Sequence, residues 1–262
     1  MITDKQFAHR TIFGFQASTM VSSGRWKNTD MRYVACIDIM GFKDMVARKE
    51  HRQVYEMMLR VSEAVKSIES LLKNFHSDSI DDFRVTLYSD SILVYSRNAS
   101  YNSRELFVAS IANLTNALFQ EKVPFKGAVA FGEMTLDFDN SIFFGQPLID
   151  AHLMQEDLGY YGVVIHATAE SEVGHNIDED YAVIEYNTPF KTGIAKHLTI
   201  MPGITFIETY EEVILNEVYD NVLRMRYNTS GPLRRYIDNT LAYLDHIDSE
   251  GRKILAAKLP QE

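Results

Sequence analysis

The stretch YVACIDIMGF, residues 33–42, decides how this chain is expected to fold. Its first seven residues form an almost continuous apolar run, which is typical of a strand buried on both faces, and Gly41 ends the run. Asp38 lies inside this run, and burying a carboxylate costs free energy unless it is paired, hydrogen-bonded or bound to a metal ion. Because Asp38 is at the carboxyl end of the strand, where α/β arrangements usually bind ligands, the stretch predicts a central strand and a functional carboxylate.

The elements that follow alternate between helical and strand patterns. Apolar residues recur at steps of three and four from Val54 to Phe75, which predicts one long helix after Gly41. The next expected elements are a hairpin, a second amphipathic helix and a strand, over residues 83–95, 107–118 and 125–131. This order is the βαββαβ plan of a ferredoxin-like or polymerase-palm domain, so the expected fold class is α+β.

The chain continues past this core with additional elements. We expect an extended piece, a helix that begins near Pro147, two strands and a C-terminal helical pair, over residues 141–145, 147–158, 162–166, 181–186, 210–225 and 233–247. The expected organisation is an N-terminal leader, one catalytic domain and a C-terminal helical appendage, over residues 1–30, 31–205 and 206–262.

Composition limits the possible functions. The 262 residues carry a net charge of −10, which argues against binding of long nucleic acids, since that task usually needs a basic face. An acidic site can still hold a nucleoside triphosphate when divalent metal ions neutralise both. No apolar run is long enough to span a membrane, and residues 1–10 lack the apolar core of a signal peptide. A single cysteine, Cys36, fits a reducing compartment, so we expect a cytoplasmic protein.

Asp90 is the second carboxylate of interest, at the corner Ser89-Asp90-Ser91 of the expected hairpin. In a βαββαβ sheet the first strand runs beside this hairpin, so Asp38 and Asp90 are expected to converge. With the backbone carbonyl of Ile39 they would supply the hard oxygen ligands that two Mg²⁺ or Mn²⁺ ions prefer. Backbone amides at the turn into the helix would face the phosphates of a nucleotide, and they belong to Met40, Gly41 and Phe42.

Each carboxylate also has a purely structural interpretation. Aspartate is common at hairpin corners, where Asp90 lies, because its side chain bonds to nearby backbone groups. Asp38 alone could cap the helix that follows Gly41. The two carboxylates together, on this topology, favour the metal site.

Four segments resemble, in family order, the motifs of class III adenylyl and guanylyl cyclases. They are similar to the two metal motifs, the glycine-bearing strand and the segment that closes the site, and they read IDIMGF (37–42), LYSDS (87–91), FKGAVAFGE (125–133) and FGQPLIDA (144–151). The resemblance covers roughly residues 33–166. It implies two metal ions, cyclisation of a nucleoside triphosphate with release of pyrophosphate, and a homodimer with sites at the interface.

Several positions depart from the family pattern. The Asn and Arg that the closing helix usually supplies are here Ile149 and Leu153, the acidic residue that selects adenine is Ile142, and the base-selecting lysine is near Thr86. With the short Ser-Asp-Ser motif, these departures resemble the bacterial pyrimidine cyclases of Pycsar antiphage defence. That resemblance implies a cyclic CMP or cyclic UMP product, with CTP favoured over UTP, and an effector that the product activates. Thr86 would contact the pyrimidine edge.

Without the usual arginine, another cation must offset the charge on the phosphates. Lys126 is the first candidate, because it lies on the strand that faces the proposed site. Lys43, Arg84 and Arg97 are further candidates, and side chains of this kind are more often just solvated surface charges, Lys126 included.

Two other functions remain open at this point. The chain could be a nucleotide-binding sensor or scaffold built on a cyclase domain that has lost catalysis, because the Asn and Arg positions are apolar. It could also be a palm-type enzyme that joins two nucleotides, as diguanylate cyclases do. The absence of a Gly-Gly-acidic-acidic-Phe hairpin counts against the latter.

Overall fold

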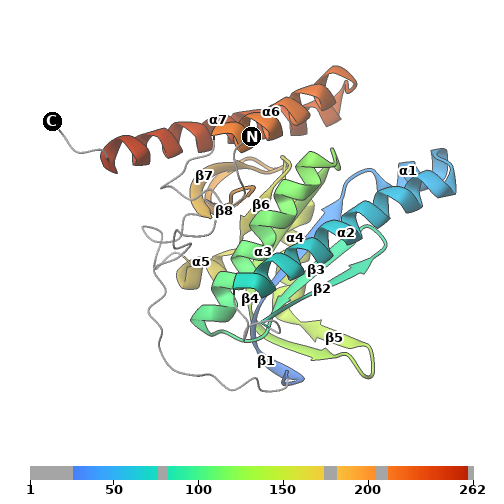
Figure 1. The fold of residues 1–262 in the computed structure, drawn as a ribbon, viewed down its shortest axis with the longest axis vertical. Coiled ribbons are helices and arrows are strands. Elements are labelled where there is room, and N and C mark those ends of the chain that lie inside the picture. The colour runs from blue at the N-terminus through green and yellow to red at the C-terminus, as the bar shows by residue number, and fades with distance from the viewer. Residues whose placement is uncertain (1–25, 76–81, 174–181, 204–211, 259–262) are drawn as a thin grey trace, which may run out of the picture.

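The computed structural model of the chain describes residues 26–75, 82–173, 182–203 and 212–258. These residues form one eight-stranded sheet with helices on both faces and a helical pair at one end (Figure 1). The α+β class expected from the sequence is confirmed. Within the described ranges, no helix combines the length and the apolar character needed to cross a bilayer.

The first seven elements form the ferredoxin-like core. They are β1 (Thr29–Ile39), α1 (Phe42–Arg48), α2 (His51–Phe75), β2 (Phe83–Tyr88), β3 (Ser91–Ser96), α3 (Tyr101–Gln120) and β4 (Phe125–Asp137). The strands lie in the order β2-β3-β1-β4, and each neighbouring pair is antiparallel. Helices α2 and α3 cover one face of this sheet (Figure 1). The predicted βαββαβ plan, which is that of a palm-type domain, is confirmed.

The central strand β1 divides its side chains between two faces. Tyr33, Ala35 and Ile37 are buried in the main core together with residues of α2 and α3. Because successive side chains of a strand alternate, Cys36 and Asp38 point to the opposite face. A strand packed on both faces needs apolar residues at nearly every position, and this explains the composition of the stretch before Asp38.

Two boundaries in the core differ from those expected. The chain after Gly41 forms two helices instead of one, because Lys49 is extended (φ −98°, ψ 157°) between α1 and α2. None of the α1 residues is fully buried, and only Phe42 and Met45 pack partly against the main core. Strands β1 and β4 are also longer than the apolar runs, since they pair with each other from Thr29 opposite Thr135 to Ile39 opposite Phe125.

The second half of the chain extends the sheet. Its elements are β5 (Ile142–Gly145), α4 (Gln146–Asp157), β6 (Val163–Ile165), α5 (Ala167–Val173), β7 (Val183–Pro189) and β8 (Ile194–Ile200). Strand β6 runs parallel to β4, and β8 and β7 follow it in the sheet. Helix α4 packs on the face opposite α2 and α3, where Ala151 is buried with Cys36 and Ala130. Strand β8 and helix α5 were not expected from the sequence; the first three residues of β8 are exposed, and the strand lacks a continuous apolar run.

The predicted C-terminal helical pair is α6 (Glu212–Tyr227) and α7 (Pro232–Lys258), separated by Gly231 at φ 69°. Figure 1 shows the pair lying across one end of the molecule. Helix α6 contacts α3, and α7 contacts β7. The Tyr243 hydroxyl donates hydrogen bonds to Thr199 Oγ1 (3.0 Å) and to the Ile200 carbonyl (3.1 Å), so α7 is bonded to the sheet.

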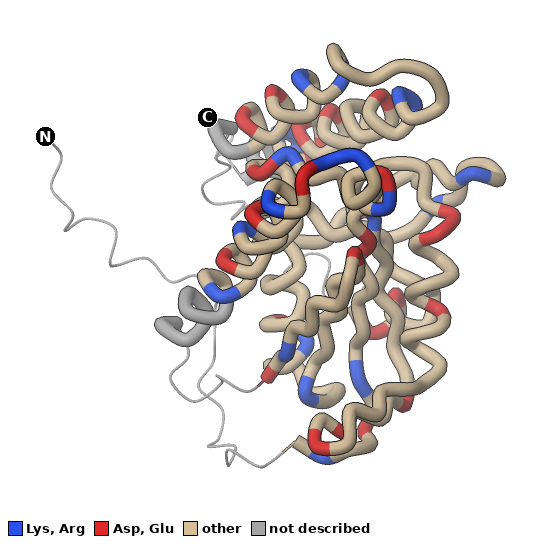
Figure 2. Tube along the Cα trace, turned by 90° about the vertical axis from the view of Figure 1, so that its right-hand side faces the viewer, with Lys and Arg blue, Asp and Glu red and all other residues tan. Residues whose placement is uncertain are grey.

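Most of the expected N-terminal leader lies outside the described residues. Of its described part, Trp26 is buried in a small cluster with Val34 and Tyr95, and the guanidinium of Arg84 stacks over its ring at 4.7 Å. Figure 2 shows acidic and basic residues interspersed along the described part of the chain.

Candidate functional site

Asp38 lies in a row of four side chains that crosses the sheet. It pairs with Ser91 of β3 on one side and with Lys126 of β4 on the other, and Ser91 pairs in turn with Tyr88 of β2. Paired residues of neighbouring strands project to the same face. The row Tyr88–Ser91–Asp38–Lys126 therefore stands on the face opposite α2 and α3.

Asp90 is brought against the end of β1 by the two-residue turn of the β2–β3 hairpin. Ser89 at φ 57° closes this turn, and the Ile39 amide donates a hydrogen bond to the Asp90 carbonyl oxygen at 2.8 Å. Burial raises the pKa of the Asp38 carboxyl above its usual range, and the nearby charge of Asp90 raises it further. The structure thus brings together the two carboxylates that the sequence singled out.

The chemistry of this pair fits a divalent cation. Within the described ranges neither Asp38 nor Asp90 forms a side-chain hydrogen bond or ion pair, and no cluster of three or more His, Cys, Asp or Glu side chains suits a metal ion. Two half-buried carboxylates that form no side-chain hydrogen bond or ion pair, although the charges of Lys126 and His152 act on Asp38, are the hard oxygen donors that Mg²⁺ and Mn²⁺ take. The donor set therefore fits a divalent ion whose remaining ligands come from outside the protein.

Lys126 lies beside Asp38 but is already bonded to α4. Its side chain is buried, and its Nζ donates a hydrogen bond to the Glu156 carbonyl at 2.9 Å. That carbonyl belongs to the last turn of α4, where helix carbonyls have no intrahelical partner and a cation is favoured. Burial lowers the pKa of Lys126, the charge of Lys191 lowers it further, and Asp38 opposes both.

The three backbone amides expected to face a phosphate lie in different surroundings. The Met40 amide donates to the Pro124 carbonyl at 2.9 Å, so it is occupied by the neighbouring loop. Gly41 is exposed and adopts φ 76°, a left-handed conformation that favours glycine. Phe42 begins α1, and its ring packs against the main core.

Thr86 stands on the same face as Asp38 but two strands away. It pairs with Leu93 of β3, which pairs with Cys36 of β1, and its side chain is half-buried. On α4, Ile149 and Leu153 are 53% and 57% exposed. These two side chains pack against no core of this chain, although the apolar residues of a helix normally face the core.

The structure adds three polar residues that the sequence analysis did not place near Asp38. The charges of His152 and Glu156, one turn apart on α4, both act on the pKa of Asp38, and Lys191 acts on that of Lys126. Lys191 lies at the tip of the β7–β8 hairpin, whose backbone meets the end of α4 through a 2.7 Å hydrogen bond from its amide to the Asp157 carbonyl. The helical spacing of residues 152 and 156 was visible in the sequence, whereas Lys191 depended on the unpredicted strand β8.

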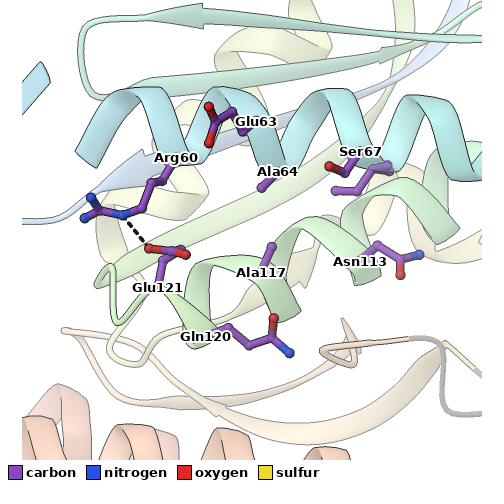
Figure 3. Close-up of a pocket in the computed structure, with 9 residues that line it drawn as sticks. Arg60, Glu63, Ala64, Ser67, Asn113, Ala117, Gln120 and Glu121 are labelled. Atoms are coloured by element: carbon purple, nitrogen blue, oxygen red, sulfur yellow. Dashed lines mark hydrogen bonds and ion pairs between the residues drawn. The ribbon is translucent and has the colours of Figure 1, made fainter. Parts of the chain in front are cut away.

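A separate cavity of about 400 Å³ lies between α2 and α3, on the other side of the sheet (Figure 3). An ion pair between Arg60 and Glu121, 2.6 Å long, closes one end of it. Its remaining lining is mixed, with small, amide and carboxylate side chains. The cavity is therefore distinct from the Asp38–Asp90 site.

Comparison with known proteins bears on the fold. No protein-family model matches the sequence, and no curated protein does. Among solved structures, the chain is similar to a bacterial light-regulated adenylyl cyclase, at 8% identity over 73% of this chain and 100% of that one, with a TM-score of 0.47. It is also similar to the adenylyl cyclase CyaB from P. aeruginosa (10% identity, 66% and 94% coverage, TM-score 0.46) and to the guanylyl cyclase Cya2 (12%, 67% and 93%, 0.43). At such low identities the likeness is one of fold.

Proposed function

We propose that this chain is a metal-dependent nucleotidyl cyclase that converts a pyrimidine nucleoside triphosphate, CTP in preference to UTP, into its 3′,5′-cyclic monophosphate and pyrophosphate. The observation that carries the proposal is the meeting of Asp38 and Asp90, two unpartnered carboxylates of the described chain, at one end of a palm-type sheet. Repulsion between two carboxylates held close together destabilises the folded state, and a cation bound to both removes that repulsion.

In the proposed reaction the nucleotide's 3′-oxygen attacks its own α-phosphorus in line. The bond from that phosphorus to the bridging oxygen breaks, pyrophosphate leaves, and the 3′-hydroxyl proton passes to solvent. Two Mg²⁺ or Mn²⁺ ions, when bound, lower the pKa of the 3′-hydroxyl and neutralise the leaving group. Asp38, Asp90 and the Ile39 carbonyl would hold these ions, and the amides of Gly41 and Phe42 would face the phosphates.

The cation that offsets the phosphate charge is Lys191 in this proposal, and Lys126 has a positioning role. Lys126 is buried and bonded to the end of α4, so in this proposal it keeps α4 and Asp38 in place. Lys191 is exposed on the hairpin tip and close enough to influence Lys126, so its side chain is available to a triphosphate.

The proposed preference for a pyrimidine rests on the side chains at the positions that would contact the base. Thr86 is a short hydrogen-bonding side chain on the Asp38 face of the sheet. Ile142 pairs with Asp137 at the other end of β4 from Lys126, so in this proposal it would meet the base only from a second copy of the chain, where it could not accept a hydrogen bond from an adenine amino group. A threonine hydroxyl both donates and accepts, so it suits the polar edge of cytosine and also that of uracil.

The proposal includes a homodimer with its sites at the interface. Ile149 and Leu153 form an exposed apolar ridge on α4, and a second copy of the chain would cover it. Sedimentation of the purified protein is expected to give a dimer, and Leu153→Asp a monomer that retains its fold. In antiphage defence the cyclic product would then activate a separate effector.

The test incubates purified protein with each of the four ribonucleoside triphosphates and Mn²⁺, with mass spectrometry of the products. We expect cyclic CMP as the main product, cyclic UMP next, and none from an Asp38→Asn control. A folded protein that gives no cyclic product from any of the four rejects the proposal, and a product of two joined nucleotides identifies the palm-type alternative.

A second candidate function is nucleotide sensing without turnover. The exposure of Ile149 and Leu153 favours it, because these two positions on α4 offer no polar group to a transition state. Calorimetry would then show nucleotide binding that Asp38→Ala leaves unchanged. Loss of binding in that variant favours the cyclase.

A further inference from the structure

We propose that Tyr88 is the residue on which the nucleobase stacks in the Asp38–Asp90 site, an inference that rests on the proposed function. Tyr88 is 78% exposed, the most exposed large apolar or aromatic side chain of the described chain. It directly precedes the two-residue turn that carries Asp90.

The register of the sheet places Tyr88 on the correct face. It stands at the outer end of the row Tyr88–Ser91–Asp38–Lys126, two strands from Asp38. Neighbouring strands are ~4.8 Å apart, so the backbone position of Tyr88 is about 10 Å from that of Asp38. A nucleotide with its phosphates at Asp38 and Asp90 therefore extends its base over this end of the sheet.

Other exposed aromatic residues of the described chain do not share this position. Tyr55, Tyr101 and Tyr227 belong to helices. Phe144 pairs with Thr135 of β4, an odd-numbered position that alternates away from Lys126 and thus from the Asp38 face. Tyr88 alone among these exposed rings stands in the row of Asp38.

The surroundings of Tyr88 suit a base rather than a core. Its neighbours on β2, Val85 and Leu87, pack against the main core, whereas Thr86 shares the Tyr88 face by alternation. An aromatic ring beside a hydroxyl offers a flat stacking surface and one hydrogen-bonding group. Base–aromatic stacking tolerates any base, so Tyr88 would supply affinity while Thr86 reads the edge.

The experiment compares Tyr88→Leu, which removes the ring, with Tyr88→Phe, which keeps it, and with Tyr227→Leu, which removes an equally exposed ring from α6. We expect Tyr88→Leu to raise the KM for the triphosphate between roughly fivefold and a hundredfold, with kcat within about twofold. Tyr227→Leu should match the wild type, and Tyr88→Phe, which keeps the ring, should raise the KM much less than Tyr88→Leu does. An unchanged KM in Tyr88→Leu would overturn the inference.

Inorganic tripolyphosphate, which has no base, separates stacking from a general disturbance of the site. Its inhibition constant should be the same for the wild type and Tyr88→Leu, and should rise in Asp90→Asn. A parallel rise in Tyr88→Leu, or its conversion of a dimer into monomers, would show that Tyr88 supports the turn or contacts a second copy, and would reject stacking. If the wild type neither binds nor turns over any triphosphate, the proposed function itself fails, which is a different outcome.

Discussion

The Ile39 amide and the Asp90 carbonyl are joined by a 2.8 Å hydrogen bond that fastens the end of β1 to the β2–β3 turn. Asp38 directly precedes one partner of this bond, and the other partner is Asp90 itself. A backbone bond thus holds the two carboxylates close, independently of any side-chain contact. We make four predictions about these two carboxylates and the lysines near them.

Replacing either carboxylate by its amide should abolish catalysis without unfolding the protein. We expect Asp38→Asn and Asp90→Asn each to lower kcat by at least about a hundredfold, because each removes a metal ligand. In metal-free buffer Asp38→Asn should melt ~2–4 °C higher than the wild type, since it removes a half-buried charge beside Asp90. Wild-type turnover in Asp38→Asn would exclude Asp38 as a ligand, and wild-type turnover in Asp90→Asn would exclude Asp90.

Divalent cations should stabilise the folded wild type. An ion that binds only the native state raises the melting temperature with its concentration, and at a hundred times the Kd the gain is about 2.7 kcal/mol. We therefore expect Mn²⁺ to raise the melting temperature of the wild type but not that of Asp38→Asn or Asp90→Asn. Scanning fluorimetry measures this without requiring turnover, and an equal rise in all three proteins would contradict it.

Lys191 should contribute to triphosphate binding. Lys191→Met is expected to raise the KM about tenfold, because it removes an exposed cation beside the site. Lys196, on the same hairpin, forms an ion pair with Glu185 at 2.6 Å and is the matched control. Steady-state kinetics with Lys196→Met should match the wild type, and identical kinetics for the Lys191 variant would remove this residue from the proposal.

Lys126 should matter for stability more than for binding. Lys126→Met leaves the Glu156 carbonyl without its donor, at a cost of about 1–3 kcal/mol in the free energy of unfolding. Urea denaturation measures that loss. A stable Lys126→Met protein with a tenfold higher KM would instead indicate direct contact with the phosphates.

The core of the fold could be predicted from the sequence because its signals are local. The apolar run before Asp38, the stripe of α2 and the hairpin corner each depend on residues close in sequence. Asp38 was identified for the same reason, since a carboxylate within an apolar run is anomalous wherever that run packs. Asp90 followed from the topology, because a βαββαβ sheet puts this hairpin beside the first strand.

The other features of the site could not be predicted, because they depend on packing between segments that are distant in the sequence. Lys191 reaches the site only because the β7–β8 hairpin meets the end of α4, and β8 has no continuous apolar pattern. The Met40 amide is likewise occupied by a residue distant in sequence, because it donates a hydrogen bond to the Pro124 carbonyl of another loop. His152 was visible as a residue of α4, but its nearness to Asp38 depends on how α4 lies on the sheet.

Helix α7 bonds to the backbone that links α4 to β6. Thr240 accepts a hydrogen bond from the Tyr161 amide (2.8 Å), and Asn239 donates one to the Gly159 carbonyl (2.8 Å). Removal of α6 and α7 would leave both groups without these partners, and they lie two and four residues beyond Asp157, the last residue of the helix that Lys126 holds. A protease or binding protein that detaches these helices would thus loosen the Asp38 side of the sheet from a distance.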